Sequence, residues 1–330
     1  MVRRHFGHLG PVALSFLVLA IAAVASPVGA QTYPSSTIRF LVGSAAGAPP
    51  DIMARLIASA LSESEGWRAI VENRPGAIAT LALGEVLKQP ADGHTLASIS
   101  LPSSAAPALL PNTRFRLDSD FAPVIKLASA YHVLVVHPSV PAKSLSEFVA
   151  LLKKQPDKMT FSSGGFGTPA HLSGEMFKLQ TGVRATHVPY QALPRAVADL
   201  LNGTNQFQFI TPLPIIDLVT TGKLRALAVT GPARLPALKD VPTVREAGFP
   251  DLIIQDWFGI LAKAGTPNDI IVRLNEAMNK TLVTPRMRDA IVKIAAEPAG
   301  GTAAEFNTFL RAQLAHWSTV VKQSGIKIDP

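Results

Sequence analysis

The sequence predicts an α/β protein built from two lobes, and three observations support this fold class. After the first 30 residues, short β-branched stretches alternate with segments whose apolar residues recur at helical spacing. The alternation is interrupted once, by a long β-branched stretch over residues 121–139, and then restarts. A chain of 330 residues that is 48% hydrophobic is also large enough for two cores.

The first lobe is expected to begin with a buried strand, a loop of small residues and an amphipathic helix. Asp51 is the expected N-cap of that helix, and Gly66 is expected to end it. The expected elements of this part are strands at 37–43, 68–73 and 94–100 and helices at 51–66 and within 74–89.

The second lobe repeats the pattern, and a return strand followed by two or three helices then completes the chain. Strands are expected at 159–164, 185–190, 207–211 and 224–230, helices at 144–155, 170–182, 194–203 and 214–223, and the return strand at 259–267. Alternation of this kind favours parallel sheets covered on both faces. A ligand is then expected between the lobes, at the carboxyl ends of the strands.

The N-terminal 30 residues have the pattern of a secretory signal peptide. Arg3 and Arg4 precede an uncharged apolar stretch, and "VGA" ends just before Gln31. We expect cleavage after Ala30 and a periplasmic location, with both Sec and twin-arginine export left open. Lobe 1 is expected at 31–130 and 255–330, and lobe 2 at 131–254.

Composition excludes several function classes. The absence of cysteine excludes disulfides, thiolate nucleophiles and thiolate metal sites. The net charge of +8 is spread along the chain without a basic block, which argues against nucleic-acid binding. No nucleophile elbow, zinc helix or P-loop is present. We therefore expect no metal, no cofactor and no enzyme activity.

Two loops of small residues are placed for anion binding. "SAAGAPPD" (44–51) and "SSGGFGTPAHL" (162–172) each join a strand to a helix. Such loops bring backbone N–H groups and the positive end of a helix to a ligand. Thr168 is expected at the cap of the second helix and Pro169 in its first turn. His171 is expected to brace this loop, and Trp257 and Phe258 are expected to pack in the core or at a hinge.

Over almost its full length after residue 30, the chain resembles the extracytoplasmic receptors of tripartite tricarboxylate transporters, the Bug family. The resemblance rests on "AAGAPPDIMARL", "SSGGFGTPAHLSGEMFKLQTG" and above all the block from Gly222 to Pro267. It implies a fold like that of type II periplasmic binding proteins, with two α/β lobes joined by two crossover segments around a ligand cleft. It also implies a receptor that closes about a hinge and is not an enzyme.

The resemblance implies a ligand class and partners as well. The ligand would be a small carboxylate, such as a di- or tricarboxylate, an acidic amino acid or an aromatic carboxylate. It would pass to the permease subunits of a membrane transporter, and the receptor is expected to be a monomer. A sensing subunit that presents the same ligand to a signalling partner is the alternative.

The expected ligand contacts come from both loops and from two further positions. The family usually has an aromatic residue in place of Ser44, a glycine in place of Ala48 and an acidic residue in place of Thr211. Specificity is expected to be set around Ser44 and Ala48. The full set of expected ligand-binding residues is Ser44, Ala46, Gly47, Ala48, Pro49, Ser103, Ser163, Gly164, Phe166, Gly167, Thr168 and Thr211.

Overall fold

The computed structural model describes residues 2, 33–110, 112–191 and 193–326, so the predicted signal peptide, residue 2 apart, lies outside the described residues. The chain divides into two compact units, residues 1–35 and 36–330, and the second unit carries the fold described below. Among the described residues, no helix has the length and apolar character required to cross a membrane.

The first lobe is built on a six-stranded sheet with the strand order β11-β4-β10-β3-β1-β2. β1 (Ile38–Val42) pairs in parallel with β2 (Ala69–Asn73) and with β3 (Thr95–Ser100). β10 (Gln255–Lys263) is antiparallel to β3 and to β4 (Phe121–Tyr131), and β11 (Ala296–Pro298) is antiparallel to β4 at the edge.

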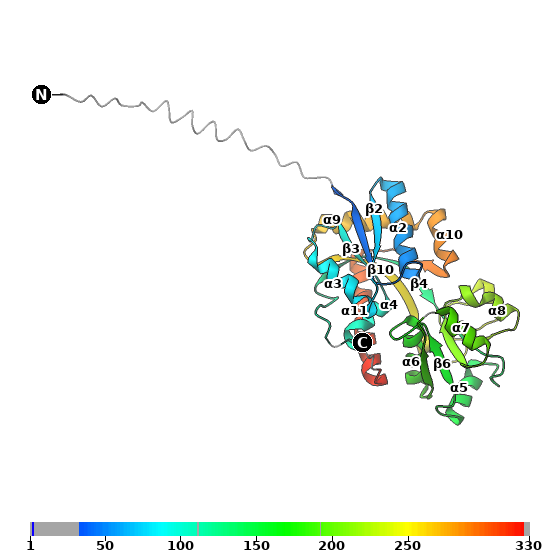
Figure 1. Ribbon diagram of the computed structural model, residues 1–330. Helices are drawn as coiled ribbons and strands as arrows, with labels where there is room; N and C mark the ends of the chain where they lie inside the picture. Colours follow the sequence, from blue (N-terminus) through cyan, green and yellow to red (C-terminus); the bar gives the residue numbers. More distant parts are fainter. Residues whose placement is uncertain (1, 3–32, 111, 192, 327–330) are drawn as a thin grey trace. The chain divides into compact units, whose positions relative to one another are not determined.

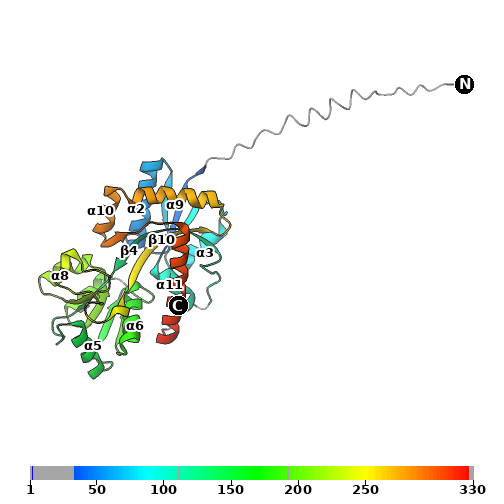
Figure 2. The same cartoon turned by 180° about the vertical axis from the view of Figure 1, so that it is seen from behind.

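Six α-helices accompany this sheet in the described part of the chain, and α9 and α11 lie on the side seen in Figure 2. They are α2 (Pro49–Glu65), α3 (Thr80–Lys88), α4 (Leu101–Leu109), α9 (Asn268–Leu282), α10 (Pro285–Lys293) and α11 (Ala303–Ser324). A short 3-10 turn, η2 (Ala77–Ala79), leads into α3.

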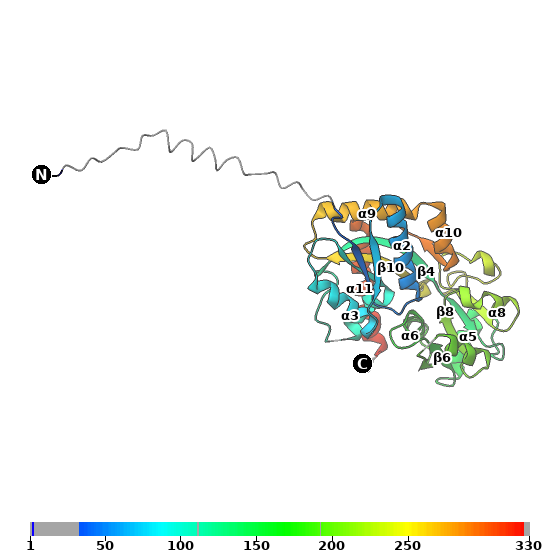
Figure 3. The same cartoon turned by 45° about the horizontal axis from the view of Figure 1, so that its top comes forward.

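The second lobe is built on a five-stranded sheet with the order β7-β6-β8-β5-β9 (Figures 1 and 3). Its strands are β5 (Val133–Val136), β6 (Thr160–Ser163), β7 (Thr186–Pro189), β8 (Phe207–Ile210) and β9 (Arg225–Val229). Its helices are α5 (Leu145–Lys154), α6 (Pro169–Thr181), α7 (Leu193–Leu201) and α8 (Ile216–Thr220). The predicted two-lobed α/β fold is thus confirmed.

The expectation of parallel sheets holds for only part of each sheet. β6 is parallel to β7 and β8, but β5 is antiparallel to β8 and β9, just as β10 is antiparallel to both of its neighbours. These strands adjoin the points where the chain passes between the sheets. A segment that leaves one sheet to enter the other does not make the right-handed helical crossover that parallel neighbours require.

The two passages between the sheets lie side by side and share one hydrogen-bonding group. The outward passage is at His132, between β4 and β5, and the return passage precedes β10 at Ile254. The buried hydroxyl of Thr230 accepts the His132 N–H at 2.8 Å and donates to the Ile254 carbonyl at 2.8 Å. The Thr230 N–H also donates to the His132 carbonyl, so one residue ties both crossovers together.

The aromatic residues that follow the return passage, at the start of β10, pack in the core, as expected. Trp257 is fully buried and contacts Phe306 and Phe309 edge-on, with ring centroids 5.9 and 5.4 Å apart. Phe258 is 2% exposed. α11 thereby packs on the return strand, and it also contacts α4 and α6.

Replacing Thr230 by valine is expected to destabilise the protein by roughly 2–4 kcal/mol, because a buried N–H and a buried carbonyl both lose their partner without a change in side-chain shape. Urea unfolding followed by circular dichroism measures the change. Thr308→Val, on the exposed face of α11, is the matched control and should change stability by no more than about 0.5 kcal/mol. Equal unfolding midpoints for Thr230→Val and the parent would contradict the assigned role of the hydroxyl.

Candidate functional site

A cavity of about 410 Å³ is lined by residues of both sheets and of the helices that begin beside them. This volume is in the range of small-molecule sites. Its wall consists of Gly43, Ser44, Ala48, Pro49, Pro50, Ile78, Ala79, Ser98, Ser100, Pro102, Ser103, His132, Gly164, Phe166, Gly167, Thr168, Pro169, Ala170, Leu193, Phe209, Ile210, Thr211 and Asp256.

The cavity brings together most of the residues expected to bind a ligand. Nine of them are on its wall, namely Ser44, Ala48, Pro49, Ser103, Gly164, Phe166, Gly167, Thr168 and Thr211. The other three, Ala46, Gly47 and Ser163, are not on the wall. Gly47 and Ser163 instead make hydrogen bonds within their own loops.

Sequence reasoning missed four polar residues of the wall. Ser98 and Ser100 end β3, His132 occupies the outward crossover and Asp256 lies at the start of β10. The only sequence signal for the aspartate was an isolated acidic residue inside the otherwise apolar stretch "QDWFGILAK". α4, which begins beside Ser98 and Ser100, was not expected as a helix.

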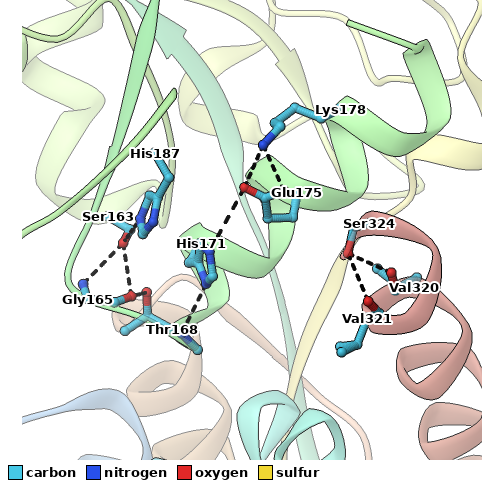
Figure 4. A network of polar contacts seen from close by, with 11 residues as sticks. Ser163, Gly165, Thr168, His171, Glu175, Lys178, His187, Val320, Val321 and Ser324 are labelled. Carbon is cyan, nitrogen blue, oxygen red and sulfur yellow. Dashed lines mark hydrogen bonds and ion pairs between the residues drawn. The ribbon is translucent and has the colours of Figure 1, made fainter. Parts of the chain in front are cut away.

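The glycine loop before α6 is held in place by its own polar groups (Figure 4). Ser163 Oγ donates to the Gly165 carbonyl at 2.9 Å and lies 2.7 Å from His187 Nε2. Thr168 Oγ1 donates to the Gly165 carbonyl at 2.7 Å, and the Gly167 N–H donates to His171 Nδ1 at 3.1 Å. The expected bracing role of His171 is confirmed by this last bond.

The two histidines beneath this loop do not supply positive charge at neutral pH. Burial lowers the pKa of His171 to about 4, with a smaller contribution from Lys178. Burial also lowers the pKa of His187 to about 3, helped by His171 and Lys178. The two rings stack with their centroids 4.1 Å apart, and Phe166 meets both edge-on. This wall is therefore neutral apart from the helix start.

α6 presents backbone donors to the cavity. Thr168 is its N-cap and Pro169 its first residue, as expected. The first helical hydrogen bond runs from the Leu172 N–H to the Thr168 carbonyl, so helix geometry leaves the N–H groups of Ala170 and His171 without an intrahelical acceptor. Because its first turn has no acidic residue, α6 also keeps the partial positive charge of its N-terminus.

The first loop differs from this arrangement, and the prediction that Asp51 is an N-cap is wrong. α2 begins at Pro49 with Ala48 as its N-cap, because the fixed φ of proline suits a first helical turn. Pro49 and Pro50 carry no N–H, and the Ala48 N–H donates to the Ala45 carbonyl. The Gly47 N–H donates to Asp51 Oδ2 at 2.8 Å.

Asp51 forms an ion pair with Arg55 at 3.0 Å, but the carboxylate in this pair is buried. Its side chain is 2% exposed, whereas that of Arg55 is 52% exposed. Burial alone would raise its pKa, but hydrogen bonds from Arg55, the Gly47 N–H and Asn73 outweigh burial and lower the pKa. Asp51 is therefore a buried anion that holds the loop before α2 in shape.

Asp256 is a second buried carboxyl group that accepts backbone N–H groups, in this case at the start of α4. Its carboxylate accepts the Trp257 N–H at 2.9 Å and is also hydrogen-bonded to the backbone of Leu101, the first residue of α4. Burial raises the pKa of Asp256 to about 7. Among the residues that the structure describes, no lysine or arginine is on the cavity wall. The groups of three or more His, Cys, Asp or Glu that could hold a metal ion are also absent from the described residues.

Two sheet-bearing lobes, joined by paired crossovers around one cavity, define a two-lobed solute-binding receptor. Residues 53–326 match the family described as the tripartite tricarboxylate transporter family receptor, and the chain belongs to that family. The family comprises periplasmic solute-binding receptors, not enzymes, which confirms the prediction made from the resemblance.

Individual relatives agree with this assignment. The chain is 32% identical to the protein BugT of Bordetella pertussis over 314 residues, covering 94% of this chain and 96% of BugT. It resembles the structure of Rpa4515 of R. palustris with adipate, with a TM-score of 0.77, 31% identity and coverage of 89% of this chain and 99% of that one. It also resembles MatC (Rpa3494) of Rhodopseudomonas palustris with bound malate, with a TM-score of 0.75, 30% identity and coverage of 88% and 100%.

Stability is expected to depend on pH through Asp256. Because its folded pKa of about 7 lies above the ordinary aspartate value of 3.8, its contribution is fully favourable below pH 4 and is lost as pH rises to 7. The difference corresponds to roughly 4 kcal/mol. Asp256→Asn should therefore be more stable than the parent at pH 8, with little difference at pH 4.

Denaturant unfolding of both proteins at pH 4, 6 and 8 measures this effect. Asp251→Asn, which alters an exposed aspartate, is the matched control and should track the parent at each pH. A stability difference between Asp256→Asn and the parent that does not vary with pH would contradict the prediction.

Proposed function

We propose that this protein captures a small organic carboxylate in the cavity between its lobes and delivers it to the membrane permease of a tripartite tricarboxylate-type transporter. The observation that carries the proposal is the start of α6. The Thr168 cap, the Ala170 N–H without an intrahelical acceptor and the positive end of the helix dipole meet at a cavity whose described wall has no basic side chain. The adipate and malate complexes of two relatives support the ligand class.

The cavity suits an anion of modest charge. Backbone N–H groups and hydroxyls can replace the water around one carboxylate, whereas a polyphosphate would require lysine or arginine side chains. Ser98, 4% exposed, and Ser44 have hydroxyl oxygens without a hydrogen-bond partner among the described residues, and both line the cavity. These two hydroxyls are available to a bound ligand.

We also propose the limits of the two lobes, from the positions of the crossovers, and export to the periplasm, from the signal-peptide pattern of the first 30 residues. Lobe 1 would comprise residues 31–130 and 255–330 and lobe 2 residues 131–254, with closure by rotation about the two crossovers. The precursor would be cut after Ala30 on export to the periplasm, and the receptor would act as a monomer. N-terminal sequencing and light scattering of the exported protein test the last two statements.

A thermal-shift screen tests the ligand class. The protein should be expressed as the full chain, purified from the periplasm and mixed separately with adipate, malate, glutarate, γ-aminobutyrate, benzoate, glucose and choline. A ligand that binds only the folded state at 100 times its Kd stabilises it by about 2.7 kcal/mol and raises Tm. At least one carboxylate is expected to do so. A shift with glucose or choline alone would refute the proposal.

Removing a single backbone donor tests the α6 contact. Ala170→Pro deletes one N–H at a helix start and creates the same Pro-Pro sequence with which α2 already begins. We expect affinity for the carboxylate found in the screen to fall about 10-fold, as for the loss of one hydrogen bond to a charged group. Ala170→Gly, which keeps the N–H, is the matched control. Equal affinity of Ala170→Pro and Ala170→Gly, measured by calorimetry, would exclude this donor.

A further inference from the structure

Among the helices that begin at the cavity, α2, α4 and α6 differ in the backbone N–H groups that they leave for an anion. The first two residues of α2 are prolines, and the Gly47 N–H before it is taken by Asp51. At the start of α4, Leu101 is hydrogen-bonded to Asp256, and Pro102 has no N–H. α6 has no internal carboxylate in its first turn. Carboxylates and prolines of the protein itself thus occupy the starts of α2 and α4, whereas the start of α6 stays open.

Asp256 is a buried carboxyl group without a cation among the described residues. It is 5% exposed, no ion pair involving it is present in the described part of the chain, and no lysine or arginine lines the cavity. His132 is the other titratable group of the wall, and burial lowers its pKa to about 4, so it is neutral. A buried carboxylate without a counter-ion is costly unless a partner arrives.

We propose that the missing cation belongs to the ligand, so that the site selects a zwitterionic carboxylate whose protonated nitrogen pairs with Asp256 and whose carboxylate binds the start of α6. This inference rests on the proposed function and narrows its ligand class from carboxylates in general to those that carry one positive nitrogen and no second carboxylate. Ser98, with its buried and unpartnered hydroxyl on the same wall, supplies a further hydrogen-bonding group.

A protonated Asp256 that donates to a second ligand carboxylate is the competing arrangement. The geometry favours the ionised form in the complex, since the carboxylate is hydrogen-bonded to the backbone of both Trp257 and Leu101. Both bonds strengthen when the acceptor is charged. A ligand ammonium would supply the counter-charge that these two neutral donors lack, whereas a second carboxylate would meet an anion.

The experiment compares ligands that differ only in the group facing Asp256. Calorimetry at pH 7.5 on the protein purified from the periplasm uses γ-aminobutyrate, α-aminobutyrate, butyrate and glutarate. In glutarate a carboxylate replaces the amine of γ-aminobutyrate. At least one aminobutyrate should bind 10-fold or more tightly than butyrate and glutarate. Asp256→Asn should reduce this preference at least 10-fold. Asp251→Asn, which makes the same charge change at an exposed position, should leave it unchanged.

The outcomes separate the two proposals. Glutarate or butyrate binding as tightly as both aminobutyrates would overturn this inference and leave the carboxylate receptor standing. So would an amine preference that survives in Asp256→Asn, or glutarate binding that tightens as pH falls through 7 in the parent but not in Asp256→Asn. Thermal unfolding at pH 8 verifies that Asp256→Asn is folded. If no carboxylate binds here or in the screen, the proposed function fails and this inference falls with it.

Discussion

The paired crossovers are the constraint on which the rest of the structure depends. Two chain segments pass between the sheets at His132 and Ile254, and the buried Thr230 hydroxyl bonds to the backbone of both. Because the passages are tied together, the carboxyl end of β3 and the loop after β6 face the same cavity. The hydrogen bonds of Thr230 do not contact a ligand themselves, but they fix the position of the residues that line the candidate site.

Charge in this cavity is controlled by backbone groups and internal carboxylates, without lysine or arginine on the wall. Asp51 and Asp256 each occupy the loop or helix start nearest to them, so α2 and α4 offer little to an anion. α6 keeps its donors, because Thr168 and the glycine loop satisfy one another instead. The charge that the wall presents to a ligand thus depends on which helix starts are paired with a carboxylate of the protein. Here the wall is positive at the start of α6 and negative at Asp256 when its carboxylate is ionised.

Local patterns were sufficient for many of these features. Apart from α4, the order of the main strands and helices follows from apolar periodicity. Gly66 and Thr168 occupy the predicted helix ends, and His171 braces the glycine loop. These features depend on residues within a few positions of one another. The Asp51 prediction failed at the same scale, since two prolines moved the start of α2 to Pro49 and left the carboxylate free to turn back to Gly47.

The sequence by itself determined the two-lobed α/β class, the positions of the two loops of small residues and, through the resemblance, the receptor family. Only the tertiary structure decided which loop still offers its N–H groups to a ligand, and that the carboxyl group of Asp256 lies on the wall of the same cavity. Asp256 and Leu101 are more than 150 positions apart, and Thr230 is about 100 positions from His132. Such pairs leave no periodic signal in one sequence, because burial and long-range pairing place them, and burial sets the pKa of Asp256.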